Sequence, residues 1–420
     1  MLNSKQEREL AYVVQVDDIR PIPGRDRVEC AVVGGWTIMV RKDQFKPGNL
    51  GVYFEIDSKV PEEEKYDFLK KYGYKIKTQK FKTPEGQFWS QGLLMAPEDF
   101  GWAEVAEIKF DKTPVRKAIR NPKGNQFYYV DDESRFLTKE LKVTYVTAED
   151  NKRKGSGSDK YKSMAQRHKD LFSHQPFRFL MKHTWGKQFL FIFFGKKRDK
   201  KKDWPIWVKK TDEERVQNMP WILDDKNPWI VTEKIDGSST TFTMKRKPMG
   251  KYEFYVCSRN VVFDKPEKSE KCFYDTNIYL EMAEKYNIEQ KMWNMLFKDD
   301  EFANCKWITI QGETFGAGVQ KRDYSLKDHD FKAFNLITDI HGRFGTIEMR
   351  EMLDFKYLIP CVPILDVNFT LPDSIEEMLE YADGFSMVDG KMREGVVLRY
   401  KDGSRSFKAV SNPYLEKFHG

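Results

Sequence analysis

The chain has few cysteines, and none are spaced to bind zinc. Five occur in 420 residues: Cys30, Cys257, Cys272, Cys305 and Cys361, with no CxxC pair among them. This scatter excludes a zinc ribbon and a disulfide framework. It favours the reduced thiols of an intracellular protein.

Long apolar runs and targeting signals are also missing. The most apolar stretch, residues 189–194, is far shorter than the roughly 20 residues that a membrane helix needs. A charged segment follows Met1, so no secretory signal is visible. We therefore expect a soluble, cytoplasmic protein with no membrane partner.

Two common phosphate-binding signatures are absent. No GxxxxGK[ST] pattern occurs, and Gly316 and Gly318 lack the third glycine of a dinucleotide fingerprint. Any nucleotide chemistry must therefore depend on another motif.

The positive charge is concentrated in one region. The net charge is +7, but residues 150–202 alone contain 16 Lys/Arg and 4 Asp/Glu, a local charge of +12. Such a block favours a phosphate-bearing partner such as nucleic acid. It is also common in solvated linkers, so both interpretations stay open.

The first 110 residues have the pattern of an all-β domain. Predicted strands cover residues 11–16, 28–33, 36–40 and 50–56, with turn sequences between them. Short strands at this spacing predict a small barrel of the oligonucleotide-binding (OB) type. Between Tyr74 and Leu94, lysines interleave with aromatic residues, which suits a nucleic-acid surface but also a barrel core.

The rest of the chain predicts a connecting region at 111–202, with a flexible basic linker at 151–158, and an α+β domain at 203–420. The domain boundaries are thus 1–110, 111–202 and 203–420. In the last domain we expect helices at 211–219 and 278–297 and closing strands at 395–400 and 406–410.

The stretch from Trp229 to Ser239 carries the main chemical signal. Residues 230–235 predict a strand that runs into the tight turn Asp236-Gly237-Ser238-Ser239. Lys234 would be fixed at the strand end. A lysine amine is a nucleophile only when deprotonated, and its ordinary pKa is about 10.4. Desolvation or nearby cations would raise the neutral fraction.

The sequence Lys234-Ile-Asp-Gly resembles the first motif of covalent nucleotidyltransferases, which comprise ATP-dependent RNA and DNA ligases and mRNA capping enzymes. The resemblance implies that Lys234 attacks the α-phosphorus of a nucleotide. It marks Lys234 and Asp236 as catalytic and places Glu233 in the nucleotide pocket.

The later motifs of that family follow in order. Ser258-Arg-Asn260 resembles the second, in which Arg259 would contact a phosphate. The stretch 311–320 resembles the third, in which Glu313 would read the ribose or hold a metal-bound water. Phe331-Lys-Ala-Phe-Asn-Leu336 resembles the motif whose aromatic ring, here Phe334, stacks on adenine.

Two further motifs complete the set. Arg393-Glu-Gly-Val-Val-Leu398 resembles the fourth motif, in which Glu394 would bind metal, with Glu313, and Val396 or Val397 would cover the base; we choose Val396. Arg405-Ser-Phe-Lys408 resembles the fifth, in which Lys408 contacts the α-phosphate. Many members have a K-x-K pair there, but this chain has Ser406 before Lys408.

A barrel placed before the motifs resembles one branch in particular, the Deinococcus- and Naegleria-type RNA ligases. The resemblance implies an α+β protein with an N-terminal OB-like barrel and a ligase (ATP-grasp-like) nucleotidyltransferase domain. It implies an ATP-dependent RNA ligase using Mg²⁺ or Mn²⁺, which seals 3′-OH/5′-phosphate breaks through lysyl-AMP. The expected substrate is a nicked RNA or RNA/DNA duplex, and the expected state is a monomer. The alternatives are a capping-type guanylyltransferase, or a nucleic-acid-binding protein with a decayed ligase pocket.

Overall fold

The structure, a computed structural model, contains two compact units. One comprises Met1–Tyr145 and Trp204–Gly420, and the other comprises Val146–Asp203. The residues that the structure describes are 1–3, 7–84, 86–100, 117–120, 127–130, 135–145, 174–183, 188, 190, 204–209, 211–263 and 277–419. The predicted linker at 151–158 and most of the basic block lie outside them. In the second unit, the described part is mainly helix α4 (Gln175–Lys182).

Residues 1–145 form the barrel part of the first unit. Three of its sheets have the orders β1-β5-β9, β2-β3-β4 and β7-β8, with β6 pairing β12. The strands are β1 (Ala11–Gln15), β2 (Asp18–Pro21), β3 (Val28–Val33), β4 (Trp36–Arg41), β5 (Leu50–Phe54), β6 (Ser58–Lys59), β7 (Thr78–Thr83), β8 (Gly86–Gln91), β9 (Leu93–Met95), β10 (Lys117–Arg120), β11 (Phe127–Val130) and β12 (Thr144–Tyr145), with 3₁₀ turns η1 (Glu64–Tyr72) and η2 (Pro97–Phe100).

Strand β1 shows why this part is compact. Tyr12 and Val14 pack into one apolar cluster with Trp36, whereas Ala11 and Val13 pack into a second cluster on the other side. Since successive side chains of a strand point to opposite faces, both faces of β1 are covered. The predicted strands at 11–16, 28–33, 36–40 and 50–56 are confirmed with shifts of at most two residues at their ends.

Residues 204–420 contain two antiparallel sheets. The four-stranded sheet has the order β20 (Ile364–Phe369), β13 (Trp229–Lys234), β21 (Gly395–Arg399), β22 (Ser406–Val410). The six-stranded sheet has the order β16 (Val262–Phe263), β15 (Tyr252–Ser258), β14 (Ser238–Arg246), β17 (Trp307–Gly316), β18 (His329–Thr338), β19 (Gly342–Arg343). Strands β13 and β14 are joined by the Asp236-Gly237 turn, so the predicted turn connects the two sheets.

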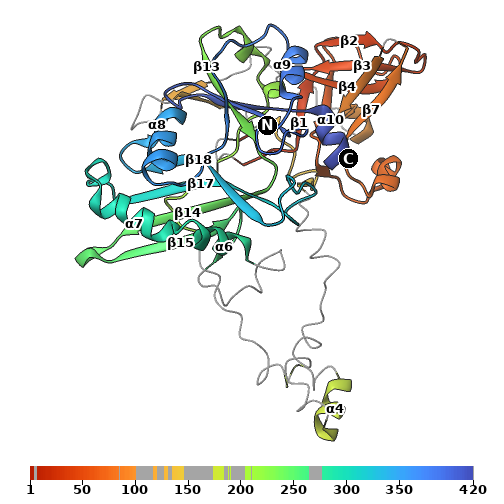
Figure 1. The fold of residues 1–420 in the computed structure, drawn as a ribbon. Coiled ribbons are helices and arrows are strands. Elements are labelled where there is room, and N and C mark those ends of the chain that lie inside the picture. Colours follow the sequence, from red (N-terminus) through yellow and green to blue (C-terminus); the bar gives the residue numbers. More distant parts are fainter. Residues whose placement is uncertain are drawn as a thin grey trace. The chain divides into compact units, whose positions relative to one another are not determined.

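Helices cover these sheets and form the main core. Figure 1 shows α6 and α7 beside β14 and β15, where Ile278, Met282 and Met292 pack with Phe242 of β14. The helical segments of this part are α6 (Ile278–Lys285), α7 (Ile288–Lys298), α8 (Thr346–Arg350), α9 (Ile375–Ala382), α10 (Asn412–Tyr414), the π-helices η10 (Glu351–Lys356) and η11 (Leu415–His419), and the 3₁₀ turns η5 (Val216–Asn218), η6 (Pro220–Asp224), η7 (Pro248–Gly250) and η9 (Asp300–Phe302).

Two helix predictions need correction. The helix expected at 278–297 is two helices, because Asn287 between them has a left-handed φ of 48°. The helix expected at 211–219 is wrong, since only the 3₁₀ turn Val216–Asn218 forms. The hydroxyl of Thr211 does not cap a helix but donates to Gln311 at 2.7 Å. Tertiary hydrogen bonds thus override the local capping pattern.

A buried polar network joins the barrel part to residues 204–420. The Oδ1 atom of Asn218 accepts hydrogen bonds from Trp36 Nε1 at 2.7 Å and from the Tyr12 hydroxyl at 3.2 Å. Its Nδ2 donates to Glu55 at 3.1 Å and to Glu214 at 2.7 Å. The segment just before β13 is therefore held by the barrel.

Among the described residues, no helix has the length and apolar character of a membrane span.

Candidate active site

Strand register places the key side chains on one face of the four-stranded sheet. Lys234 lies opposite Gly395, Thr232 lies opposite Val397, and Val397 lies opposite Lys408. Directly opposed residues share a face, so Lys234 and Lys408 point to the same side. A Cβ on Gly395 would lie 2.2 Å from the Ala409 carbonyl oxygen, so only glycine lets β22 approach here.

Lys234 contacts a glutamate that is 160 residues away in sequence. Its Nζ donates a hydrogen bond to Glu394 Oε2 at 2.6 Å. Burial acts to lower the pKa of Lys234, but Glu394, Glu313 and Asp236 outweigh it and raise that pKa above its ordinary value. Desolvation alone therefore does not produce a neutral amine in this state. The charged form of the Lys234 amine is favoured, chiefly by the carboxylate of Glu394.

Glu313 reaches the same place from strand β17 of the other sheet. A Cβ on Gly237 would lie 2.3 Å from the Thr314 carbonyl oxygen and 3.0 Å from Glu313 Cγ, so the glycine of the first motif admits β17. Burial raises the pKa of Glu313 to about 8, and the charges of Glu394 and Asp236 add to the rise. The positive charge beside Glu313 is therefore not enough to offset the effect of burial and of the two neighbouring carboxylates on its ionised form.

Asp236 is buried and held by two tyrosines. Its backbone N–H donates to the Tyr324 hydroxyl at 2.7 Å, and its Oδ2 accepts from the Tyr414 hydroxyl at 2.8 Å. Tyr414 lies beyond the last motif, and no sequence pattern singles it out. Asp236 therefore has a fixed position two residues after Lys234.

Lys408 and Arg259 share one carboxylate. Asp212 Oδ1 accepts from Lys408 Nζ at 2.6 Å, and Asp212 Oδ2 accepts from Arg259 at 3.0 Å. Asp212 belongs to the extended segment that was expected to be helical. The structure thus brings both predicted phosphate-binding cations together around an anion of the chain itself.

Arg215 is a further residue of this segment that sequence reasoning did not single out. Its side chain is buried, and its Nε and Nη1 atoms have no hydrogen-bond partner among the described residues. Its Nη2 lies 3.7 Å from Asp57 of the barrel part. Arg215 also forms a backbone bridge with Lys408. Buried donors without acceptors beside Lys408 suit an anion such as a phosphate. The available signal was the stretch 209–218, which resembles a segment just before the nucleophile in one RNA ligase branch and was therefore expected to place residues 211–218 near the nucleotide or the nick.

The prediction for Val396 is not supported by its position. Val396 is completely buried in the core behind the sheet, with Trp229, Leu398 and Phe407. Its neighbour Val397 is half-buried on the face of Lys234 and Lys408. Of the two valines, Val397 is the one that faces the site.

Phe334 is half-buried in β18, beside a small cluster that contains Ile235, Phe315 and Tyr324. Its backbone oxygen accepts a hydrogen bond from Arg399 of β21, which links the two sheets. Phe334 and Val397 therefore come from two strands that this hydrogen bond ties together.

Glu233 points away from Lys234, because adjacent strand residues face opposite sides. Its carboxylate accepts from the Ser386 hydroxyl and from the Met387 backbone N–H, the latter at 2.8 Å. Burial raises its pKa. In this structure Glu233 anchors the loop that leads into Glu394.

The carboxylates suit a divalent cation by chemistry, although they are not yet arranged as ligands. Among the described residues, no group of three or more His, Cys, Asp or Glu side chains is placed to hold a metal ion. Glu394 and Glu313 nevertheless offer the oxygen donors that Mg²⁺ and Mn²⁺ prefer. The high pKa of Glu313 also shows that added positive charge would be favourable there. The residues therefore fit such an ion.

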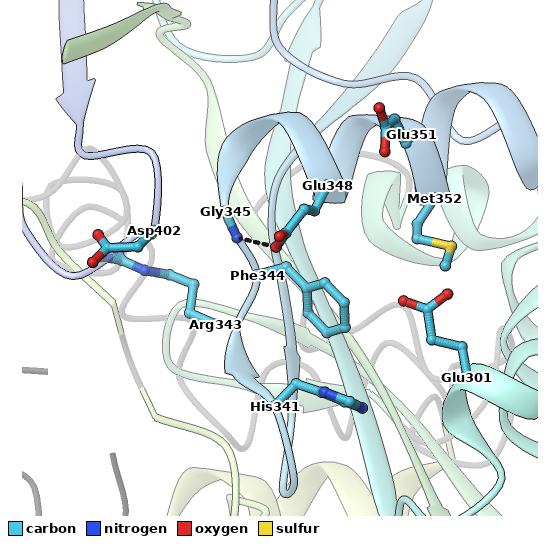
Figure 2. A pocket seen from close by; sticks show the side chains of 9 residues that line it. All are labelled: Glu301, His341, Arg343, Phe344, Gly345, Glu348, Glu351, Met352 and Asp402. Atoms are coloured by element: carbon cyan, nitrogen blue, oxygen red, sulfur yellow. Dashed lines mark hydrogen bonds between the residues drawn. The ribbon is translucent and has the colours of Figure 1, made fainter. Parts of the chain in front are cut away.

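A separate pocket of about 480 Å³ lies at the start of α8 (Figure 2). Four carboxylates line it together with Arg343 and His341. None of the predicted site residues contributes to it, so it is not the nucleotide site.

Comparison with known proteins agrees with this architecture. Residues 227–410 match the family model described as RNA ligase, and residues 10–97 match one described as an OB-fold domain. No curated protein sequence gave a match.

Solved structures of an RNA ligase from Naegleria gruberi are similar over nearly the whole chain. The enzyme with PPi is 27% identical, with a TM-score of 0.66, covering 98% of this chain and 99% of that one. A substitution variant with ATP and Mn has the same identity and TM-score and covers 98% of both chains. Another variant with AMP and Mn is 27% identical, with a TM-score of 0.65, covering 98% of this chain and 99% of that one.

Proposed function

We propose that this chain is an ATP-dependent RNA ligase with an N-terminal OB-fold domain, and that it joins RNA ends through a lysyl-AMP intermediate on Lys234. One observation carries the proposal. The Lys234 amine lies 2.6 Å from Glu394, at a strand end whose face it shares with Lys408.

Lys234 must lose its proton before it can attack, and we propose that its carboxylate neighbours control this loss. Glu394 and Glu313 raise its pKa in the present state. These two residues would also hold the Mg²⁺ or Mn²⁺ ion, which supplies positive charge to the phosphates when bound. With their charge shared by a bound ion, these carboxylates would stabilise the ammonium less, burial would favour the neutral amine, and the proton would pass to solvent.

The first step forms a bond between Lys234 Nζ and the α-phosphorus of ATP, and pyrophosphate leaves. Lys408 and Arg259 bind the phosphates in place of Asp212, and Arg215 supplies buried donors beside them. Phe334 and Val397 enclose the adenine, while Glu233 holds the loop before Glu394 and Asp236 fixes the turn. In later steps the AMP passes to a 5′-phosphate end. A 3′-hydroxyl then attacks that phosphorus and releases AMP.

The barrel part is proposed to grip the polynucleotide, a nicked RNA or RNA/DNA duplex. Three of its lysines support this. Burial lowers the pKa of Lys75, and so does repulsion from Lys77 and Lys59 and from Lys321 of the catalytic part. Ammonium groups that gather in this way favour a polyanion. We further propose a monomer with functional regions at 1–110, 111–202 and 203–420.

The test is covalent labelling with α-³²P-ATP and a divalent metal, followed by mapping of the label. We expect labelling of the wild type and none of Lys234→Ala, while the exposed control Lys226→Ala labels normally. Lys234→Ala should still join a pre-adenylylated nick. Label on another lysine would refute the assignment, and labelling with GTP alone would indicate a capping-type enzyme. A panel of nicks with RNA or DNA on each side would define the substrate.

A further inference from the structure

The residues after the last family-matched position form a buried connection to the active site. The RNA ligase match ends at residue 410, and we call residues 411–419 the C-terminal segment. It contains α10 and the π-helical turn that follows. The Tyr414 side chain within it is fully buried.

One end of the C-terminal segment holds two motifs at once. The Tyr414 hydroxyl donates to Asp236 Oδ2 at 2.8 Å, two residues from Lys234. The Ser411 backbone N–H donates to the Glu394 carbonyl oxygen at 2.9 Å. The segment therefore touches the neighbours of both partners in the Lys234–Glu394 contact.

The same segment is embedded in the barrel. Gln91 Nε2 of β8 donates to Asn412 Oδ1 at 2.7 Å, and both side chains are buried. Leu415 packs in the barrel cluster that contains Tyr12 and Trp36. A continuous path of buried contacts thus runs from the barrel through α10 to Asp236.

We propose that Tyr414 is a positioning residue for lysine adenylylation, which fixes Asp236 and so holds Lys234 in line with its target. The inference rests on the proposed lysyl-AMP chemistry. Tyr414 does not touch the reacting atoms; it limits the movement of the turn that carries the nucleophile. Small displacements of a reacting group slow a reaction steeply, whereas nucleotide binding depends on other side chains.

The test is Tyr414→Phe, which keeps the ring and removes one hydroxyl. We expect kcat for lysine adenylylation to fall about tenfold or more, with KM for ATP changed less than about twofold. The matched control is Tyr357→Phe, because the Tyr357 hydroxyl donates to Asp299 at 2.6 Å away from the site. The control should lose comparable thermal stability and keep its rate.

Several outcomes separate the possibilities. A folded Tyr414→Phe protein that adenylylates at the wild-type rate would overturn the inference, as would a rate loss equal to that of Tyr357→Phe. If Tyr414→Phe does not fold, Asn412→Ala breaks only the barrel end of the path and should also slow adenylylation; an unchanged rate there would count against the inference. If wild-type protein forms no covalent AMP at all, the proposed function itself fails.

Discussion

The carboxylate of Asp212 lies 2.6 Å from the Nζ of Lys408, where a phosphate of the nucleotide is expected. Burial tends to raise the pKa of Asp212, but Lys408 and Arg259 hold it well below its usual range. Burial lowers the pKa of Lys408, which its pairing with Asp212 opposes. Asp212 therefore offsets part of the positive charge of Lys408 and Arg259, and we expect the phosphates of a nucleotide to compete with it.

Replacing Asp212 should expose this competition. We expect Asp212→Asn to lower KM for ATP by about tenfold, because one charged hydrogen bond contributes roughly 1.5–3 kcal/mol. Adenylylation kinetics over a range of ATP concentrations measure it. Asp224→Asn, which removes an exposed carboxylate outside this network, is the control. A higher KM in Asp212→Asn would mean that Asp212 helps to bind the nucleotide rather than competing with it.

Glu394 should be needed for its charge and not only its shape. We expect both Glu394→Ala and Glu394→Gln to lose adenylylation and sealing by at least about a hundredfold, because an amide binds a divalent cation poorly. Labelling over a Mn²⁺ titration measures the first reaction. Near-normal activity of Glu394→Gln would place the metal elsewhere.

Glu313 should make the metal-free protein less stable as the pH rises. Burial and nearby carboxylates raise its pKa from 4.5 to about 8. Between these values the folded protein keeps a proton that the unfolded chain has released, so stability decreases through this window. With a chelator present, Tm should fall more between pH 5.5 and 8.5 for wild type than for Glu313→Gln. An equal fall in Tm for the two proteins would show that Glu313 is already ionised at neutral pH. Adding Mn²⁺ should reduce the fall in Tm of the wild type.

Val396 and Val397 offer a direct test of strand orientation. Val397→Ala should raise KM for ATP with little change in Tm, since its side chain faces the site. Val396→Ala should instead cost about 1–3 kcal/mol of stability with KM unchanged, since it leaves a cavity in the core. Thermal unfolding and adenylylation kinetics on both variants decide it. The reverse pattern would contradict the register.

The barrel should matter even for the nucleotide step. The motifs alone suggest that a fragment beginning near residue 202 would still form lysyl-AMP. The structure gives Asn218 three partners in the barrel: Trp36, Tyr12 and Glu55. Without them the Asp212–Arg215 segment loses the part of its support that comes from the barrel, so we expect the fragment to adenylylate at least tenfold more slowly.

Asn218→Ala in the full chain should show a smaller loss of the same kind, because it leaves buried groups unpaired at about 1–3 kcal/mol each. Adenylylation rates of the fragment and the variant, with circular dichroism to check folding, measure this. A folded fragment with the full rate would show that the site is independent of the barrel.

Sequence reasoning worked where a motif marks a strand end. Lys234, Glu313 and Glu394 were each predicted near such an end and Lys408 within the last strand, and the structure gathers them although up to 174 positions separate them. The α+β class and the N-terminal OB fold are confirmed. The individual roles of these residues remain predictions.

What failed depended on long-range contacts. Whether Val396 or Val397 points to the face of Lys234 depends on how β21 pairs with β13 and β22. The local sequence around the two valines does not reveal this pairing. The segment at 211–219 has a good capping pattern, yet Thr211 and Asp212 find partners in distant strands. Tyr414 belongs to no motif, because its importance comes only from its contact with Asp236.

The alternation along β21 and β22 also determines which length changes the chain can tolerate. Inserting or deleting one residue within either strand would turn Val396 or Ala409 toward the nucleotide and bury Val397 or Lys408. Such a register shift would move every side chain of the strand from the site face to the core face, and the reverse, at once. In the turn at 401–405, by contrast, the number of residues does not decide which side chains of the strands face the core. We therefore expect evolutionary changes in length to be confined to this turn. Libraries that vary loop length can target it without reversing the two faces of the sheet.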